Sequence, residues 1–128
     1  MTTPSSPAFT INTSTRLIRV QLSGQWSTLK DLEYITALGE TMEHMRKNQW
    51  IMAVDMREWQ VSDKVAKENV KFPIILDRRN QIGEAWLVAD LDQAKHLDTF
   101  FENQPFSPAR FTDEAEFEKW ISTFSFNE

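Results

Sequence analysis

The sequence predicts an α/β protein with a mostly parallel sheet of four or five strands packed with about four helices. Strand-like and helix-like segments alternate along the chain, and this alternation implies parallel pairing through right-handed crossovers. Two continuous apolar runs, residues 51–54 and 85–89, are typical of strands buried on both faces. Residues 29–45 carry apolar side chains every three or four positions, which predicts a long helix covering such a sheet.

The N-terminal part predicts a tail and an antiparallel edge strand. Residues 1–7 contain two prolines and two serines, so we expect a disordered tail, followed by one domain over residues 8–128. Residues 9–13 and 16–22 alternate apolar and polar side chains. They are interpreted as two half-buried strands joined by a tight turn at residues 12–15.

The next segment is interpreted as a turn over residues 24–27, with Trp26 at its tip, leading into the long helix. Thr28 followed by Asp31 predicts a capping box at the helix start. Gly39 lies inside this helix, where it costs about 1 kcal/mol relative to alanine, and is interpreted as allowing close packing on the sheet. The predicted buried stripe consists of Leu29, Leu32, Ile35, Leu38, Met42 and Met45.

The second half of the chain predicts shorter elements. Residues 55–62 are interpreted as a polar loop after the central strand, and residues 63–71 as a helix that Pro73 interrupts. A second short helix is expected over residues 73–79, and another over residues 90–102. A short strand at residues 109–111 then precedes a final helix capped by Thr112 or Asp113, with an inward side of Phe117, Trp120, Ile121 and Phe124.

Composition and motifs argue against several classes of function. The chain has no cysteine and a net charge of -5, so neither thiolate chemistry nor nucleic-acid binding is expected. No apolar run approaches the roughly 20 residues of a membrane span, and no secretory signal is recognisable, so a cytoplasmic protein is expected. His44 and His96 lack partners at a readable spacing, and no glycine-rich phosphate loop occurs. No catalytic residue, metal or cofactor is therefore expected.

Four segments in this order carry a family resemblance: RLIRVQLSGQW, WIMAVDMREW, EAWLVAD and RFTDEAEFEKWI. Together they resemble the SpoIIAA-like proteins, which are related to STAS domains and anti-sigma-factor antagonists. The closing segment is similar to the ending of the uncharacterised STAS/SEC14-like bacterial branch. The resemblance covers the chain after the tail, and it implies a βα superhelix.

The phosphorylation switch of the anti-sigma antagonists is not expected here. Those proteins carry a phosphorylatable serine in an Asp-Ser pair at the start of the helix after the central strand. Here the pair is reversed, as Ser62-Asp63, and Lys64 occupies the position of that serine. Ser62 is therefore interpreted as a helix N-cap.

A candidate binding site lies where the strands end. Ligands of α/β sheets tend to bind beyond the carboxyl ends of the strands, and this edge is expected to collect Trp26, Asp55, Arg57, Trp59 and Asp90. The two tryptophans could form an apolar clamp, with Arg57 holding an anion. In the alternative interpretation, the tryptophans cover the end of the core and the aspartates cap helices.

A second candidate surface surrounds Pro73, where Phe72 and Ile75 contribute to an unusually apolar short segment. This segment either packs into the core or offers an apolar surface to a partner, a second copy or a lipid. We expect a non-catalytic protein that binds a protein partner or a small apolar ligand through these two surfaces. The alternative is a lipid or apolar-metabolite carrier with an internal cavity, by analogy with SEC14-type proteins. A homodimer is left open.

Overall fold

The molecule is built on one five-stranded sheet whose strands follow each other in sequence order, β1-β2-β3-β4-β5. The structure, a computed structural model, describes residues 7–62, 64–67, 76–102 and 104–124. The strands are β1 (Ala8–Ser14), β2 (Leu17–Trp26), β3 (Trp50–Val61), β4 (Gln81–Leu87) and β5 (Ala109–Phe111). β1 pairs with β2 antiparallel, and all other pairs are parallel. The predicted fold class and the antiparallel N-terminal edge strand are confirmed.

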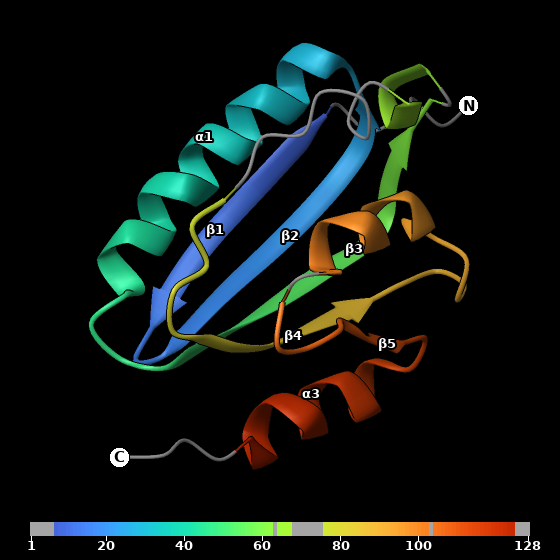
Figure 1. Cartoon of the computed structure of the whole chain (residues 1–128). Helices are drawn as coiled ribbons and strands as arrows, with labels where there is room; N and C mark the ends of the chain where they lie inside the picture. The colour runs from blue at the N-terminus through green and yellow to red at the C-terminus, as the bar shows by residue number, and fades with distance from the viewer. Residues whose placement is uncertain (1–6, 63, 68–75, 103, 125–128) are drawn as a thin grey trace.

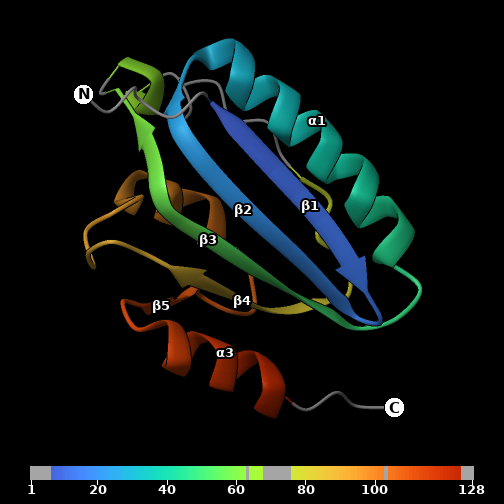
Figure 2. The same ribbon diagram turned by 180° about the vertical axis from the view of Figure 1, so that it is seen from behind.

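Helices pack on both faces of the sheet. The helices are α1 (Thr28–Met45), the 3₁₀-helix η1 (Lys95–Phe101) and α3 (Glu114–Thr123). Residues 64–67 form a further, short helical turn after β3. α1 runs alongside β1 and β2, whereas α3 lies beside β4 and β5 (Figures 1 and 2). The larger core lies between the sheet, α1 and η1, and a smaller one lies beneath α3.

The central strand β3 is longer than predicted, because residues 55–61 belong to it and do not form a loop. Gln21 of β2 lies opposite Asp55. Two residues later, Ser23 lies opposite Glu58, so β3 carries one extra residue, as in a β-bulge. The bulge places Arg57 and Glu58 on the surface in succession. Two adjacent exposed polar residues break the alternation of a strand, which is why this segment was wrongly predicted as a loop.

The neighbouring end of β2 was also wrongly predicted, since residues 24–26 continue the strand instead of turning. Gly24 has a φ of 80°, in the left-handed region that glycine adopts without steric cost. The backbone at Gly24 therefore has a conformation typical of the predicted turn, although no turn forms there. The strand nevertheless continues through this left-handed residue, because Gly24 and Trp26 pair with Trp59 and Val61 of β3.

The first helix begins at Thr28, which was predicted as the capping residue. Its N-cap is instead Ser27, whose hydroxyl accepts a hydrogen bond of 3.2 Å from the Lys30 amide. At the other end of the chain, the Asp113 carboxylate accepts a bond of 2.9 Å from the Ala115 amide and caps α3. Phe117 is buried under this helix, as predicted. Within the described residues, the five strands, α1 and α3 therefore follow each other in the predicted order.

Three predicted segments differ from the structure. Of the short helix predicted over residues 73–79, the described residues 76–79 are not helical. β4 begins four residues earlier than the predicted strand, and the predicted helix over residues 90–102 is a turn followed by the shorter η1. Ala94 has a φ of 62° at the start of η1, which prevents one continuous helix. Phe72, Pro73 and Ile75 lie outside the described residues. No helix in the described part of the chain has the length and apolar character needed to cross a membrane.

Candidate interaction site

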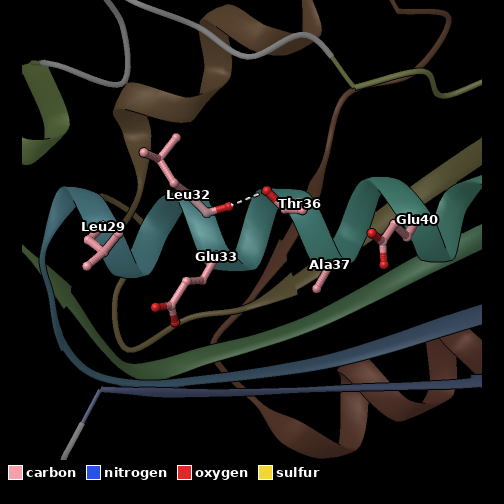
Figure 3. A pocket seen from close by; sticks show the side chains of 6 residues that line it. All are labelled: Leu29, Leu32, Glu33, Thr36, Ala37 and Glu40. Atoms are coloured by element: carbon pink, nitrogen blue, oxygen red, sulfur yellow. Dashed lines mark hydrogen bonds between the residues drawn. The ribbon is translucent and has the colours of Figure 1, made fainter.

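The outward face of α1 carries an apolar surface that the sequence did not predict to be exposed. Leu29 is 68% exposed and Leu32 is 42% exposed, although both were expected in the buried stripe. Figure 3 shows them on one helix with the other side chains that line an open depression of about 430 Å³. These are Glu33, Thr36, Ala37 and Glu40.

Helix geometry explains why the two leucines face outward. An α-helix turns by about 100° per residue, so each three-residue step rotates the stripe by about 60° from its previous direction. Leu29, Leu32, Ile35 and Leu38 follow each other in three such steps. The first two therefore lie well away from Leu38, which is buried against the sheet. Tyr34 takes their place in the core.

Charged and polar groups surround this surface. Lys30 forms an ion pair of 3.3 Å with Glu33, while Glu40 is exposed on the next turns of the helix. The Thr36 hydroxyl donates its hydrogen to the Leu32 carbonyl at 2.8 Å, so its oxygen can only accept hydrogen bonds from a partner. The depression thus combines an apolar floor with an acidic rim.

Asp31 lies on the first turn of α1 and is half-buried. Burial raises the pKa of its carboxyl from the ordinary 3.8 to about 6, because desolvation disfavours the charged form. Tyr34, on the buried side, also has a raised pKa, chiefly because of burial and secondly because of the nearby Glu84 carboxylate.

The structure brings Trp26 and Trp59 together, but in the core and not as an exposed clamp. Their rings meet edge to face at 5.8 Å, and only 2% and 5% of their respective surfaces are exposed. The Trp26 indole N–H donates to the Ser23 carbonyl at 2.8 Å, and the ring also contacts Tyr34 and Phe9. The prediction of an exposed clamp was wrong. The alternative, in which both tryptophans cover the end of the core, is the observed arrangement.

Asp55 and Arg57 are adjacent at the surface, on the sheet face that α3 covers in part. The Arg57 guanidinium donates to the Asp55 carboxylate at 2.9 and 3.1 Å, and lies 3.7 Å from Glu114 at the start of α3. The hydrogen bond with Asp55 raises the pKa of Arg57 above its usual value. Two carboxylates of the chain therefore already accompany this guanidinium. Anion binding by Arg57 stays a prediction.

Neither aspartate of the candidate edge caps a helix. The Asp55 carboxylate accepts from the Arg57 amide within the bulged strand, and the Asp90 carboxylate accepts from the Asp92 amide in the turn after β4. Ser62 does cap, because its hydroxyl accepts a hydrogen bond of 3.2 Å from the Val65 amide at the start of the helical turn. The interpretation of Ser62 as an N-cap is confirmed.

The two histidines are separated in the fold. His44 is exposed in the last turn of α1, whereas His96 is half-buried with its ring 6.2 Å from that of Trp59. Burial lowers the pKa of His96, so its imidazole is neutral near neutral pH. No cluster of potential metal ligands occurs within the residues that the structure describes.

Sequence reasoning missed a buried polar network on β4. Glu84 is only 2% exposed and pairs with Arg78 at 2.8 Å. The Gln81 side chain donates to the same carboxylate at 2.9 Å, and the Trp86 indole N–H donates to its other oxygen. Both carboxylate oxygens are therefore bonded, as burial of a charge requires. The only signal was one acidic residue beside an otherwise apolar run.

Comparisons with solved structures bear out the resemblance at the level of the fold. The chain is similar to an uncharacterised protein of the DUF3478 family with a SpoIIAA-like fold from Shewanella loihica, with a TM-score of 0.61 and 17% identity. That match covers 94% of this chain and 98% of the other. It is also similar to an anti-sigma factor antagonist from Mycobacterium paratuberculosis, with a TM-score of 0.54, 11% identity, and coverage of 95% and 99%. No protein-family model and no curated protein matches the sequence.

Proposed function

We propose that this SpoIIAA-like domain acts without catalysis, by binding a partner protein through the outward face of α1. The observation that carries the proposal is the exposure of Leu29 and Leu32. Among the described residues only three large apolar side chains are strongly exposed, and two of them lie three positions apart on this helix. Adjacent exposed leucines with a polar surround are typical of a binding surface.

The chemistry of the surface suggests the class of partner. Glu33 and Glu40 border the leucines, so the complementary surface carries apolar side chains flanked by lysine or arginine. An amphipathic helix with basic flanks meets both conditions, because it presents an apolar stripe between charged edges. The depression is open, which favours a macromolecule over a small apolar ligand that needs an enclosed pocket.

The fold comparison supports a regulatory role of this kind. One structural relative is an anti-sigma factor antagonist, a name that denotes action against another protein. The sequential strand order also lacks the topological switch point at which open α/β sheets usually form a ligand crevice. Because the sheet offers no such crevice, we rank a lipid or apolar-metabolite carrier second. A lipid-sized ligand found by native mass spectrometry of the purified protein would favour the carrier function.

Exchange of the two leucines tests the proposed surface. We expect Leu29→Glu/Leu32→Glu to weaken binding of the cognate partner about 30-fold or more, since each buried leucine contributes about 1.5–3 kcal/mol. The partner is the protein that co-purifies in stoichiometric amount from the host and is then produced separately. Its affinity for the wild-type and variant chains is measured by isothermal titration calorimetry.

Leu91→Glu is the matched control, because Leu91 is 60% exposed but lies in the turn after β4, away from α1. This variant should bind with the wild-type affinity. Equal affinity of all three chains, or equal weakening by both variants, would refute the α1 surface. Circular dichroism should show the same fold in each, because the three leucines are exposed.

A further inference from the structure

The free edge of the sheet at β1 lacks several of the features that usually protect an edge strand. β1 is the outermost strand, as Figure 2 shows, and no described strand pairs with its outer side. Its seven residues, AFTINTS, contain no charged side chain and no proline, and they pair with β2 without a bulge. Proteins normally block such an edge with charges, proline, a bulge or a very short strand.

The opposite edge of the sheet does have this protection. β5 has only three residues and includes Arg110, whereas β1 has seven residues and no charge; each strand follows directly after a proline, Pro108 and Pro7 respectively. The two edge strands belong to the same sheet, and only β1 lacks a charged side chain. The missing charge is therefore specific to β1 and not a property of all strands. The edge at β1 is therefore open to pairing in a way that the edge at β5 is not.

The hairpin geometry shows which backbone groups of β1 are free. Ser14 lies opposite Leu17 across a two-residue connection. Residues that flank such a connection hydrogen-bond to each other, and the bonding direction alternates along the strand. The N–H and C=O groups of Phe9, Ile11 and Thr13 therefore point away from β2, toward the free edge.

The strand is also complementary to itself. Ile11 is the central residue of β1, so antiparallel pairing of two copies about Ile11 places Ile11 opposite Ile11. Thr10 then lies opposite Asn12, and Phe9 opposite Thr13. Every outward backbone group finds a partner. Phe9, Ile11 and Thr13 share one face of the strand, and Thr10 and Asn12 share the other. No pair in this register brings two like charges together.

We propose that a second copy of this chain pairs antiparallel with β1, centred on Ile11, and joins the two sheets into one. Such a contact is isologous, and it closes as a two-fold dimer. α1 packs over β2 and reaches β1 at Phe9, whose ring meets that of Tyr34 edge to face at 5.4 Å on one face of the sheet. Phe9 and Ile11, half-buried in the single chain, gain further cover from the partner strand.

Charge substitutions on the exposed side of β1 test the register. In the dimer, Thr10→Glu/Asn12→Glu places two acidic residues opposite each other at two symmetric sites, whereas Thr10→Lys/Asn12→Glu places opposite charges there. Within one chain, residue 12 faces Arg19 in both variants and residue 10 faces the neutral Gln21. The two variants therefore differ at one position and match closely as monomers.

The molecular mass is measured by light scattering over a concentration series. The wild type and the Lys/Glu variant should be dimers, and the Glu/Glu variant should have a dimer dissociation constant about tenfold or more higher. Hydrogen exchange should show protected amides at Phe9, Ile11 and Thr13 in the dimer. A monomeric wild type, equal dimerisation of both variants, or rapid exchange at these three amides would overturn the proposal.

Discussion

Two glycines in the structure have opposite steric surroundings, and both can be tested by substitution with alanine. A β-carbon added at Gly39 of α1 would lie 3.7 Å from the Leu76 side chain, an ordinary contact distance. Against the residues that the structure describes, Gly39 is therefore not needed for close packing, contrary to the interpretation from sequence. Gly39→Ala should raise the free energy of unfolding by up to about 1 kcal/mol, because alanine favours the helix. Urea denaturation measures this gain.

Gly83 of β4 is the contrasting case. A β-carbon there would lie 3.0 Å from the ring of Phe124 and 3.2 Å from that of Trp120, which cover this part of the sheet. Gly83→Ala should lower the free energy of unfolding by about 1–3 kcal/mol, because the two rings must move. The same urea measurement applies. A loss at Gly39 or a gain at Gly83 would contradict the packing described for α1 and α3.

Asp31 gives the stability a dependence on pH. Folding raises its pKa from 3.8 to about 6, so the native state binds more protons than the unfolded chain between these values. Its stabilising contribution is complete below the unfolded pKa and is lost as pH rises through the folded pKa. Asp31→Asn stays neutral. At neutral pH we therefore expect this variant to be about 1 kcal/mol more stable than the wild type.

This gain is smaller than the pKa shift alone implies, because Asp31 is only half-buried and solvent screens its charge. The gain should decline as the pH falls and disappear below the unfolded pKa, where the wild-type carboxyl is also protonated. Chemical denaturation of both proteins across this range gives the difference directly. A difference that does not change with pH would mean that Asp31 is not desolvated in the native state.

At the scale of elements, the extension of β3 changes what Trp59 is expected to do. An exposed clamp residue could be removed with little loss of stability. Trp59 instead packs edge to face on Trp26 within the core, so Trp59→Ala should lower the free energy of unfolding by about 3–5 kcal/mol. Thermal and urea denaturation measure the loss.

Arg57→Ala is the control for that substitution, since Arg57 lies on the same strand but is exposed and its ion pairs contribute little. Its stability should change by less than about 1 kcal/mol. If Trp59→Ala were as mild as Arg57→Ala, the burial of the aromatic cluster would be wrong. A clamp role for Trp59 would then have to be considered again.

The elements differ in how well their sequences predict them. The hairpin of β1 and β2, the apolar part of β3 and the capped helix α3 were predicted because period and capping are local signals. The direction in which α1 presents Leu29 and Leu32 was not, because it depends on how much of the helix the sheet covers. The bulge in β3 was missed for a related reason, since a bulge is defined by its register against β2.

For the whole molecule, the order of elements was enough to predict the fold, but the site was not predicted. The predicted site assumed that both Trp26 and Trp59 lie on loops, and the structure puts both in strands. The buried Glu84 has a counter-charge, Arg78, six residues away, and only the folded chain shows that the two meet. At 17% identity over 94% of the chain, the same fold is reached with few shared residues.

The strand order has a consequence for biosynthesis. Every strand pairs with the strand that precedes it in sequence, so no strand waits for a partner that lies further along the chain. As the chain leaves the ribosome, β2 can pair with β1 before α1 is complete, and each later strand meets an existing template. Growth in this order moves the exposed edge steadily toward the C-terminus, while the first edge, β1, stays open from the start.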